Sequence, residues 1–252
     1  MLFEYFKEFN KRVVKKSAVK KTASKKASTK KGASKKTASK KSSPKTSSVK
    51  LDIKNLRESL SRIIPLNLEL SDANPLDSNG FSPDGADLCI YKPFCRDIVE
   101  IMGGSIPHEL LAGTVFSVDV LNKKTLQDVM NRVAAVKKLN RLSTEEEDES
   151  FNVPSFIIAG AGDYSMQNLK NDILNGYMNN NVDDGLQFEI LVILDKGLVI
   201  RDWHMKTYVS LETGEDTMVF FFILLNEYLE AERDSGLDFR KYVKTDRSYN
   251  EY

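Results

Sequence analysis

Residues 114–139 read TVFSVDVLNKKTLQDVMNRVAAVKKL, and this stretch decides the fold. Its beginning, 114–120, is rich in apolar and β-branched residues, which is typical of a strand. The segment 123–142 then repeats apolar residues at helical spacing, and a second apolar run follows at 155–159. A helix between two such strands is the connection of a βαβ unit. We therefore expect 114–120 and 155–159 to be parallel neighbours.

Other apolar runs extend this unit into a sheet covered by helices. Further strands are predicted at 66–70, 86–91 and 189–194, and a turn at 195–197 leads into an antiparallel region reaching residue 209. Further helices are predicted at 51–64, 165–178 and 217–233. The sequence thus predicts the fold class α/β, with a mixed sheet that has a parallel βαβ core flanked by helices.

The net charge of +1 conceals two oppositely charged parts. Residues 1–50 carry 17 basic and 2 acidic residues, a net charge of +15. The other 202 residues carry 20 basic and 34 acidic residues, a net charge of −14. A basic segment joined to an acidic body is typical of an interaction tail on a folded domain.

Composition also excludes several classes of protein. The longest apolar run, 219–225, is far shorter than the roughly 20 residues of a membrane-spanning helix. Residues 1–10 lack the continuous apolar stretch of a secretory signal peptide. Two cysteines, Cys89 and Cys95, are too few for a disulfide framework and, with two histidines, form no zinc motif. We expect a soluble intracellular protein, located in the cytoplasm or nucleoid, or in the nucleus of a eukaryotic host.

A lysine pair recurs every five residues from residue 15 to residue 41. Because this period matches neither a helix nor a strand, no apolar face forms, and we expect residues 15–50 to be a disordered tail. Such a polycation binds nucleic-acid phosphates without reading base sequence. The expected nucleic-acid-binding residues are Lys15, Lys16, Lys20, Lys21, Lys25, Lys26, Lys30, Lys31, Lys35, Lys36, Lys40 and Lys41.

The tail resembles the Lys/Ala/Ser/Thr-rich tails of linker histones and bacterial histone-like proteins. Alternative roles are a solubilising linker, attachment to an acidic lipid or protein, or a nuclear-localisation signal. Residues 1–14 form a short amphipathic segment that we expect to dock on the domain or on a partner. We expect an α/β domain at 51–243 and a C-terminal tail at 244–252.

The domain resembles the restriction-endonuclease-like PD-(D/E)XK superfamily, closest to a bacterial and phage family of unknown function. The motifs that carry this resemblance, in chain order, are SPDGADLCIY at 82–91, IPHELL at 106–111, TVFSVDVLNKKTL at 114–126, VAAVKKL at 133–139 and ILVILDKG at 190–197. Members of this superfamily hold a divalent metal with carboxylates from two neighbouring strands and use a lysine to position or activate water.

The resemblance implies a degenerate catalytic site at Glu58, Asp87, Ser117 and Asp119. Asp87 takes the place of the first carboxylate, and Glu58 matches an acidic residue of the preceding helix. Ser117 and Asp119 take the places of the Glu and Lys of the E-x-K motif, so one charge is lost and another is reversed. We expect the strand that carries Asp87 to lie beside the one that carries Ser117 and Asp119, with these side chains on the same side of the sheet.

The resemblance therefore implies no catalytic residue, no metal and no cofactor in the present site. The alternative is a rearranged Mg²⁺ site formed by Asp87 and Asp119, with Lys123 or Lys124 reaching back to it. In that case the protein is a metal-dependent nuclease.

Two other features of the sequence, a glycine motif and a cysteine, are candidates for a functional site. The sequence GAGDYS at 160–165 has a spacing found in phosphate-binding turns, with Asp183 and Asp184 about twenty residues further on. An ordinary strand-to-helix turn with Ser165 as the N-cap is the preferred interpretation. Cys89 alternates with apolar residues and is predicted to be a buried thiol, and no sequence spacing pairs it with a histidine.

These observations favour a nucleic-acid-associated protein in which a polycationic tail is joined to a catalytically degenerate nuclease-like domain. The alternatives are the metal-dependent nuclease with a rearranged site, and a structural protein whose tail neutralises packaged nucleic acid or an acidic partner. The expected partner is nucleic acid, bound through the tail, and no membrane span is expected. The oligomeric state is left open by the sequence.

Overall fold

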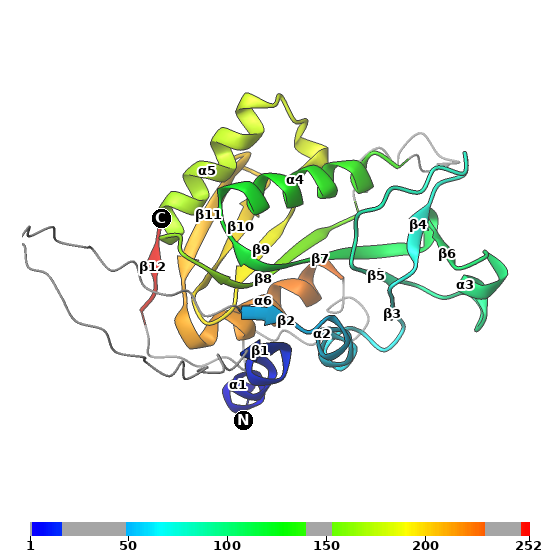
Figure 1. Ribbon diagram of the computed structural model, residues 1–252, viewed down its shortest axis with the longest axis horizontal. Helices are drawn as coiled ribbons and strands as arrows, with labels where there is room; N and C mark the ends of the chain where they lie inside the picture. The colour runs from blue at the N-terminus through cyan, green and yellow to red at the C-terminus, as the bar shows by residue number, and fades with distance from the viewer. Residues whose placement is uncertain (1, 17–48, 140–152, 230–247) are drawn as a thin grey trace, which may run out of the picture.

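The computed structural model describes residues 2–16, 49–139, 153–229 and 248–252. An eight-stranded mixed sheet forms its centre, in the order β12-β11-β10-β9-β8-β7-β5-β3 (Figure 1). The strands are β3 (Glu69–Ser71), β5 (Leu88–Tyr91), β7 (Leu111–Leu121), β8 (Ser155–Gly162), β9 (Ile190–Ile193), β10 (Gly197–Asp202), β11 (Thr207–Glu212) and β12 (Asn250–Glu251). The predicted fold class, α/β with a mixed sheet flanked by helices, is therefore confirmed.

The predicted parallel pair lies at the middle of this sheet. β7 and β8 run parallel, with Thr114 opposite Ser155 and Ser117 opposite Ile158. Helix α4 (Lys123–Lys137) connects the two strands, and Asn122 caps its N-terminus by accepting hydrogen bonds from the backbone N–H groups of Lys124 and Thr125. The expected βαβ unit is therefore present, and β9 continues it as a further parallel neighbour of β8.

Helices cover both faces of the sheet. On one face lie α4 and α5 (Met166–Asn179), and on the other lie α1 (Leu2–Val13), α2 (Ile53–Leu60) and α6 (Thr217–Tyr228) (Figure 1). Each face has its own apolar core. One core joins α4 and α5 to β7, β8 and β9, and the other joins α1, α2 and α6 to the opposite face of the same strands. Because the central strands are buried on both faces, they are apolar over nearly their whole length.

A smaller layer lies beyond the β5 and β3 edge of the sheet. It contains the parallel pair β4 (Asn74–Leu76) and β6 (Ser105–Pro107), the short helix α3 (Ile98–Ile101) and the 3-10 helix η1 (His108–Leu110). Two other 3-10 helices are η2 (Asp184–Leu186) and η3 (Gly214–Asp216). β4 lies between the predicted strands 66–70 and 86–91, where the sequence analysis places no strand.

The N-terminal segment packs on the domain. Phe6, Phe9 and Val13 of α1 are almost fully buried, and the ring of Phe6 lies 5.5 Å from that of Phe222 on α6. Docking on the domain was one of two outcomes that the amphipathic pattern predicts, the other being a separate partner. This helix therefore belongs to the core that covers one face of the sheet.

A short strand pair closes the base of the lysine-rich stretch. β1 (Val14–Lys16) runs antiparallel to β2 (Val49–Leu51), with Lys16 opposite Val49. Lys15 and Lys16, which the sequence assigns to the tail, lie in β1. The other ten predicted nucleic-acid-binding lysines lie outside the described residues, as does the acidic stretch 144–150. The stretch 17–48 is therefore tethered to the domain at both of its ends.

The last residues of the chain also join the sheet. The sequence predicts a tail from residue 244, but β12 pairs with Leu211 and Glu212 of β11. The backbone of Tyr252 exchanges hydrogen bonds with that of Ser210 at 3.0 and 3.2 Å. Among the described helices, none has the length and apolarity required to cross a membrane.

A buried ion pair joins the end of α4 to the start of β9. Lys137 Nζ lies 2.6 Å from Glu189 Oε1, and the side chains are only 1% and 2% exposed. Glu189 also accepts a hydrogen bond from the backbone N–H of Ser155. Burial raises the pKa of Glu189 and lowers that of Lys137, while their attraction for each other opposes both shifts. This pair fixes the α4 end against the sheet.

The packing of α1 can be tested with one core substitution. Replacing Phe6 with Ala removes a buried ring, so we expect the free energy of unfolding to fall by about 3–5 kcal/mol. Lys11→Ala, on the exposed face of the same helix, should change it by less than about 0.5 kcal/mol. Urea denaturation followed by circular dichroism measures both values. Equal, small effects of the two substitutions would show that α1 does not contribute to the core.

Candidate active site

Asp87 lies at the start of β5, beside β7. Its backbone N–H donates to the carbonyl of Val115, and its Oδ2 accepts hydrogen bonds from the backbone N–H and the hydroxyl of Ser117, at 2.6 and 2.9 Å. The predicted proximity of the Asp87 strand to the Ser117 strand is therefore present. One carboxylate oxygen is already occupied by two donors from the residue that stands in the Glu position.

Arg132 of α4 occupies the other oxygen of Asp87. Its Nη2 lies 3.0 Å from Asp87 Oδ1, and its Nε and Nη2 donate to the carbonyl of Gly85 at 2.9 and 2.5 Å. The guanidinium also lies over the ring of Phe116, 5.5 Å from its centroid. The side chains of Arg132 and Asp87 are 34% and 28% exposed. Asp87 thus has an internal cation as its partner.

A glycine allows the loop before β5 to approach α4 this closely. A Cβ atom built on Gly85 would lie 2.7 Å from Val136 Cγ2, a separation that real Cβ contacts do not show. The carbonyl of Gly85 can therefore reach the guanidinium of Arg132 only while residue 85 has no side chain. Gly85 thus accepts two hydrogen bonds from Arg132, and Asp87 forms an ion pair with the same guanidinium.

Asp119 is exposed and interacts with the strand pair that precedes the domain. Its Oδ1 accepts a hydrogen bond from the backbone N–H of Leu51, at 2.8 Å. Leu51 is the last residue of β2, so this contact fastens the base of the lysine-rich stretch to β7. Asp119 thus contacts β2 on the α1 and α2 face of the sheet, whereas Asp87 pairs with Arg132 of α4 on the other face. The expectation that these two side chains lie on the same side of the sheet is therefore wrong.

Glu58 lies on α2 and points to solvent. Its Oε1 is 2.5 Å from Arg62 Nη2, one helical turn further on, and its side chain is 61% exposed. Such an exposed pair on a helix surface contributes little to stability. The structure places Glu58 in this surface pair and gives it no described contact with Asp87, Ser117 or Asp119.

These residues do not fit a divalent metal. Mg²⁺ prefers several free oxygen ligands in near-octahedral geometry. Oδ2 of Asp87 accepts two hydrogen bonds from Ser117, and Oδ1 forms an ion pair with Arg132. No cluster of three His, Cys, Asp or Glu side chains suitable for a metal occurs in the described parts of the chain. Lys123 and Lys124, proposed to complete a rearranged site, are exposed on the first turn of α4.

Arg132 was missed by the sequence reasoning. It lies on α4 next to the apolar residues Val129, Val133 and Val136, and a helix that borders solvent commonly carries a basic residue at such a position. Neither its spacing from Asp87 nor its neighbours distinguish it from the other lysines and arginines of the chain. Only the tertiary approach of α4 to the start of β5 reveals its role.

The glycines of the 160–165 motif lie in closely packed surroundings. A Cβ on Gly160 would lie within 3.1 Å of Leu51 and Val49 side chains, and one on Gly162 would lie 3.0 Å from Ile193 Cδ1. Ser165 caps α5, because its hydroxyl accepts from the backbone N–H of Asn168 at 3.2 Å. The preferred interpretation, an ordinary strand-to-helix turn, is therefore confirmed for Ser165.

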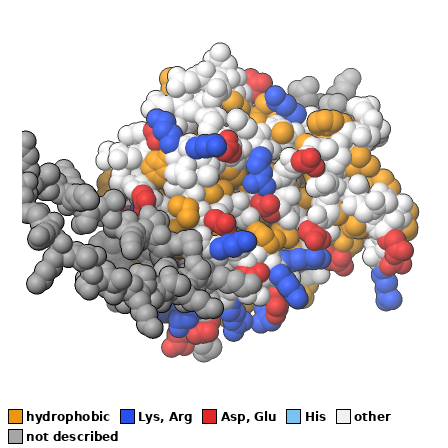
Figure 2. Space-filling model, viewed as in Figure 1, with side chains coloured by type: hydrophobic (Ala, Val, Ile, Leu, Met, Phe, Trp, Pro, Cys, Tyr) orange, Lys and Arg blue, Asp and Glu red, His pale blue; other side chains and the backbone are white. Residues whose placement is uncertain are grey.

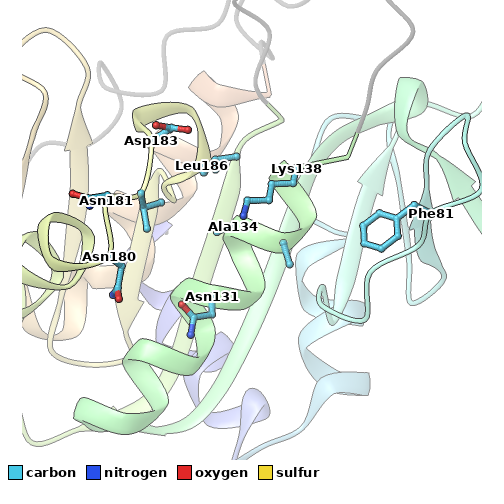
Figure 3. Close-up of a pocket in the computed structure, with 10 residues that line it drawn as sticks. Phe81, Asn131, Ala134, Lys138, Asn180, Asn181, Asp183 and Leu186 are labelled. Atoms are coloured by element: carbon cyan, nitrogen blue, oxygen red, sulfur yellow. The ribbon is translucent and has the colours of Figure 1, made fainter.

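Asp183 lines a separate hollow of about 490 Å³ between α4 and the segment after α5 (Figure 3). One wall is the α4 stripe of Asn131, Ala134, Ala135 and Lys138, and Phe81 lies across from it (Figure 3). Its lining contains a single carboxylate and includes neither the glycine motif nor Asp87. The hollow therefore does not extend the Asp87 site.

The cysteine and histidine residues supply no nucleophile and base pair. Cys89 is buried in β5, and burial raises the pKa of its thiol to about 12, so that the thiol stays protonated at neutral pH. This confirms the predicted buried thiol. His108 is buried in η1, and His204 is exposed in the turn between β10 and β11.

The structure resembles solved structures of NucC. The apo form from E. coli MS115-1 superposes with a TM-score of 0.59 and 14% identity over 71% of this chain and 82% of that one. The cAAA-bound form from P. aeruginosa ATCC27853 gives a TM-score of 0.55 and 13% identity over 70% and 76% of the two chains. The chain has the restriction-endonuclease-like fold. No protein-family profile and no curated protein matches the sequence.

This fold is the one that the order of the motifs leads us to expect. The two NucC structures are too distant in sequence to assign an activity to this chain. Its Asp87, Ser117 and Asp119 nevertheless lie on the two adjacent strands where the resemblance places the site of a PD-(D/E)XK domain.

A double-mutant cycle can measure the coupling of Asp87 to Arg132. We expect Asp87→Asn, Arg132→Gln and the double variant to show a coupling of about 0.5–1.5 kcal/mol, because the ion pair is close, at 3.0 Å, but about one-third exposed. Urea denaturation of the four proteins supplies the values. A cycle on Glu58 and Arg62 is the control, with coupling below about 0.5 kcal/mol. Additive effects at Asp87 and Arg132 would contradict the observed pairing.

Proposed function

We propose that the protein associates with nucleic acid through its lysine-rich stretch, held on a restriction-endonuclease-like domain that does not cleave. The stretch 17–48 contains eleven lysines and no acidic residue. Neutralising phosphates along a nucleic acid would release counterions and supply affinity that does not depend on base sequence.

One observation carries the noncatalytic part of this proposal. The carboxylate that would hold a metal in this fold is bound on both of its oxygens, by Ser117 and by Arg132. A serine hydroxyl cannot supply the negative charge of the missing Glu, and Asp119 has the opposite sign to the missing Lys. A domain with these substitutions lacks both the ligand charge and the cationic group that hydrolysis of a phosphodiester requires.

The charge distribution supports assigning affinity to the lysine-rich stretch. On the face seen in Figure 2, acidic and basic side chains of the described residues are interspersed, and no continuous basic area forms there. Residues 51–252 carry 20 basic and 34 acidic residues, a net charge of −14. An acidic body of this kind repels a polyanion at long range.

The second candidate function is a metal-dependent nuclease with a rearranged site. The similarity to NucC favours this second function, because the shared restriction-endonuclease-like fold is a nuclease fold. It requires Arg132 to leave Asp87, so that the carboxylate can bind a metal. A structural or packaging role for the lysine-rich stretch is compatible with the proposed association, because in both roles the lysines neutralise nucleic-acid phosphates.

The base of the lysine-rich stretch allows a clean deletion. Lys16 lies opposite Val49 in the β1–β2 pair, so a two-residue Asn-Gly turn can replace residues 17–48 and join the strands as a hairpin. We expect this variant to keep the melting temperature of the full chain but to lose most of its affinity for duplex DNA. Salt titrations on two duplexes of unrelated sequence measure the affinity. Unchanged binding, or strong preference for one duplex, would assign recognition to the domain.

The absence of catalysis is tested separately. Purified protein incubated with Mg²⁺ or Mn²⁺ should leave both duplex and single-stranded DNA intact, because the E-x-K motif is missing. An Asp87→Ala variant is the matched control for contaminating nucleases. Cleavage by the natural sequence that disappears in Asp87→Ala and in Asp119→Ala would establish the second candidate function.

A further inference from the structure

The N-terminal element formed by α1 and β1, residues 2–16, is held on the domain by residues that follow the lysine-rich stretch. The ring of Phe6 lies 5.5 Å from that of Phe222 on α6, and the carbonyl of Val13 accepts a hydrogen bond from the backbone N–H of Asp52 at 2.9 Å. The strand β1 pairs with β2. We call the part of α2, α6 and β2 that receives residues 2–16 the α1-docking surface. The element reaches this surface only across the lysine-rich stretch.

The polar contacts of this element add little to its attachment. Lys7 Nζ lies 2.9 Å from Glu215 Oε2, and both side chains are exposed. The amide of Asn10 donates to Asp195, but its Oδ1 is buried without a hydrogen-bond partner among the described residues. An exposed ion pair contributes little, and a buried acceptor without a partner weakens the docking. These features favour a docking that is reversible.

The β1–β2 pair limits how far the lysine-rich stretch can reach. Lys16 lies opposite Val49, and residues opposite each other in an antiparallel pair have Cα atoms about 5 Å apart. The 32 residues of 17–48 span at most about 110 Å when a chain of that length is extended. A chain whose ends are held together reaches only half as far, roughly 55 Å. Lysine contacts along more of a duplex than this therefore require β1 to leave β2.

The connection also decides which docking surface residues 2–16 occupy. In the free protein it keeps them near their own surface, at an effective concentration in the millimolar range. At lower protein concentrations each chain therefore occupies its own surface. A stretch that is extended along a duplex instead carries residues 2–16 towards the next copy on the same duplex. Because all copies are identical, the exchanged contacts are the same ones and need no new interface.

We propose that residues 2–16 of one copy dock on the α1-docking surface of the next copy when both are bound along one nucleic acid. The contact of Phe6 with Phe222 and the pairing of β1 with β2 then join two chains instead of closing one. Each copy donates its N-terminal element and accepts that of a neighbour, so the contact is head-to-tail and does not close. The expected assembly is a row of copies that grows along the nucleic acid.

This inference rests on the proposed nucleic-acid association and adds a second copy of this chain as a partner. It assigns a function to the N-terminal element, which the lysines alone leave without one. It also gives a physical reason for cooperative binding on long nucleic acids.

A disulfide between chains tests the exchange. Lys15 of β1 lies opposite Lys50 of β2, at a separation that a disulfide can bridge. One chain carries Lys15→Cys, and a second chain of different size carries Lys50→Cys, so positions 15 and 50 can be joined only between chains. The two are mixed on a duplex of about 60 base pairs, roughly 200 Å long, oxidised and separated on a non-reducing gel. We expect at least about ten times more of this disulfide on the duplex than without DNA.

A third variant controls for proximity alone. Lys138 is exposed at the end of α4, which covers the opposite face of the sheet (Figure 1). Lys15→Cys mixed with Lys138→Cys should form at least about five times less interchain disulfide on the same duplex. The natural protein, oxidised in the same way, gives the background from Cys89 and Cys95. Melting temperatures establish that each variant is folded.

The double variant Lys15→Cys/Lys50→Cys supplies an independent measurement. Oxidised before DNA is added, it is locked with β1 on its own β2 and keeps every residue of 17–48. The locked form should bind the long duplex at least about threefold more weakly than the same protein after reduction, and with less cooperativity. On a duplex of about 12 base pairs, roughly 40 Å long, the two forms should bind equally. The natural protein with and without reductant is the control.

The outcomes separate this inference from the proposed function. Duplex binding in which positions 15 and 50 are joined no more often than positions 15 and 138 would overturn the inference while nucleic-acid association stands. An interchain disulfide that is equally abundant without DNA would also overturn it, because exchange would then not depend on nucleic acid. Equal binding of the long duplex by the locked and reduced forms would have the same meaning. If the natural protein binds no duplex at low salt, both proposals are wrong.

Discussion

The parallel pairing of β7 with β8, closed by α4, is the constraint on which the rest of the structure depends. It places β7 between a parallel neighbour and the antiparallel strand β5, and it brings α4 across the same strands. The start of β5 then meets Ser117 on β7 and Arg132 on α4 within one small volume. The Asp87 site is thus a direct product of the crossover connection and not of any local motif.

The charges around Asp87 are the basis for proposing that the domain does not cleave. A divalent metal at a carboxylate site supplies two positive charges and several open coordination positions. A guanidinium supplies one positive charge with fixed donor directions, and it satisfies the carboxylate while offering nothing that polarises water. With Ser117 in the place of the Glu, Asp87 is the carboxylate that Arg132 neutralises, and the carboxylate of Asp119 instead binds the backbone of β2.

Much of the fold could be predicted from sequence because it depends on periodic patterns. The apolar, β-branched run at 114–120 indicates a strand, the apolar stripe of α4 indicates a helix, and their order along the chain indicates the βαβ unit. The β1–β2 pair could not be predicted, because Val14–Lys16 and Val49–Leu51 are three-residue strands separated by the lysine-rich stretch. The partners of Asp87 and Asp119 depend on tertiary contacts of Arg132 and Leu51, residues whose types occur throughout the chain.

The positions of the site residues could be predicted from the sequence more fully than their contact partners. Asp87 and Ser117 could be placed on adjacent strands from the order of the motifs, and their hydrogen bonds agree with that placement. Glu58 and Asp119 could only be assigned by analogy, and their carboxylates instead bind Arg62 and the backbone of Leu51. Analogy transfers positions along a strand, whereas the partner of each side chain depends on the neighbours present in this chain.

Titration of Mn²⁺ into the full-length protein, followed by isothermal calorimetry, tests the central claim most directly. The account predicts no saturable binding that depends on Asp87, because Arg132 and Ser117 already occupy its carboxylate. The titration of an Asp87→Asn variant should be indistinguishable from that of the natural sequence. A saturable site that is present in the natural protein and absent from Asp87→Asn would show that the carboxylate is available to a metal, and would contradict the account.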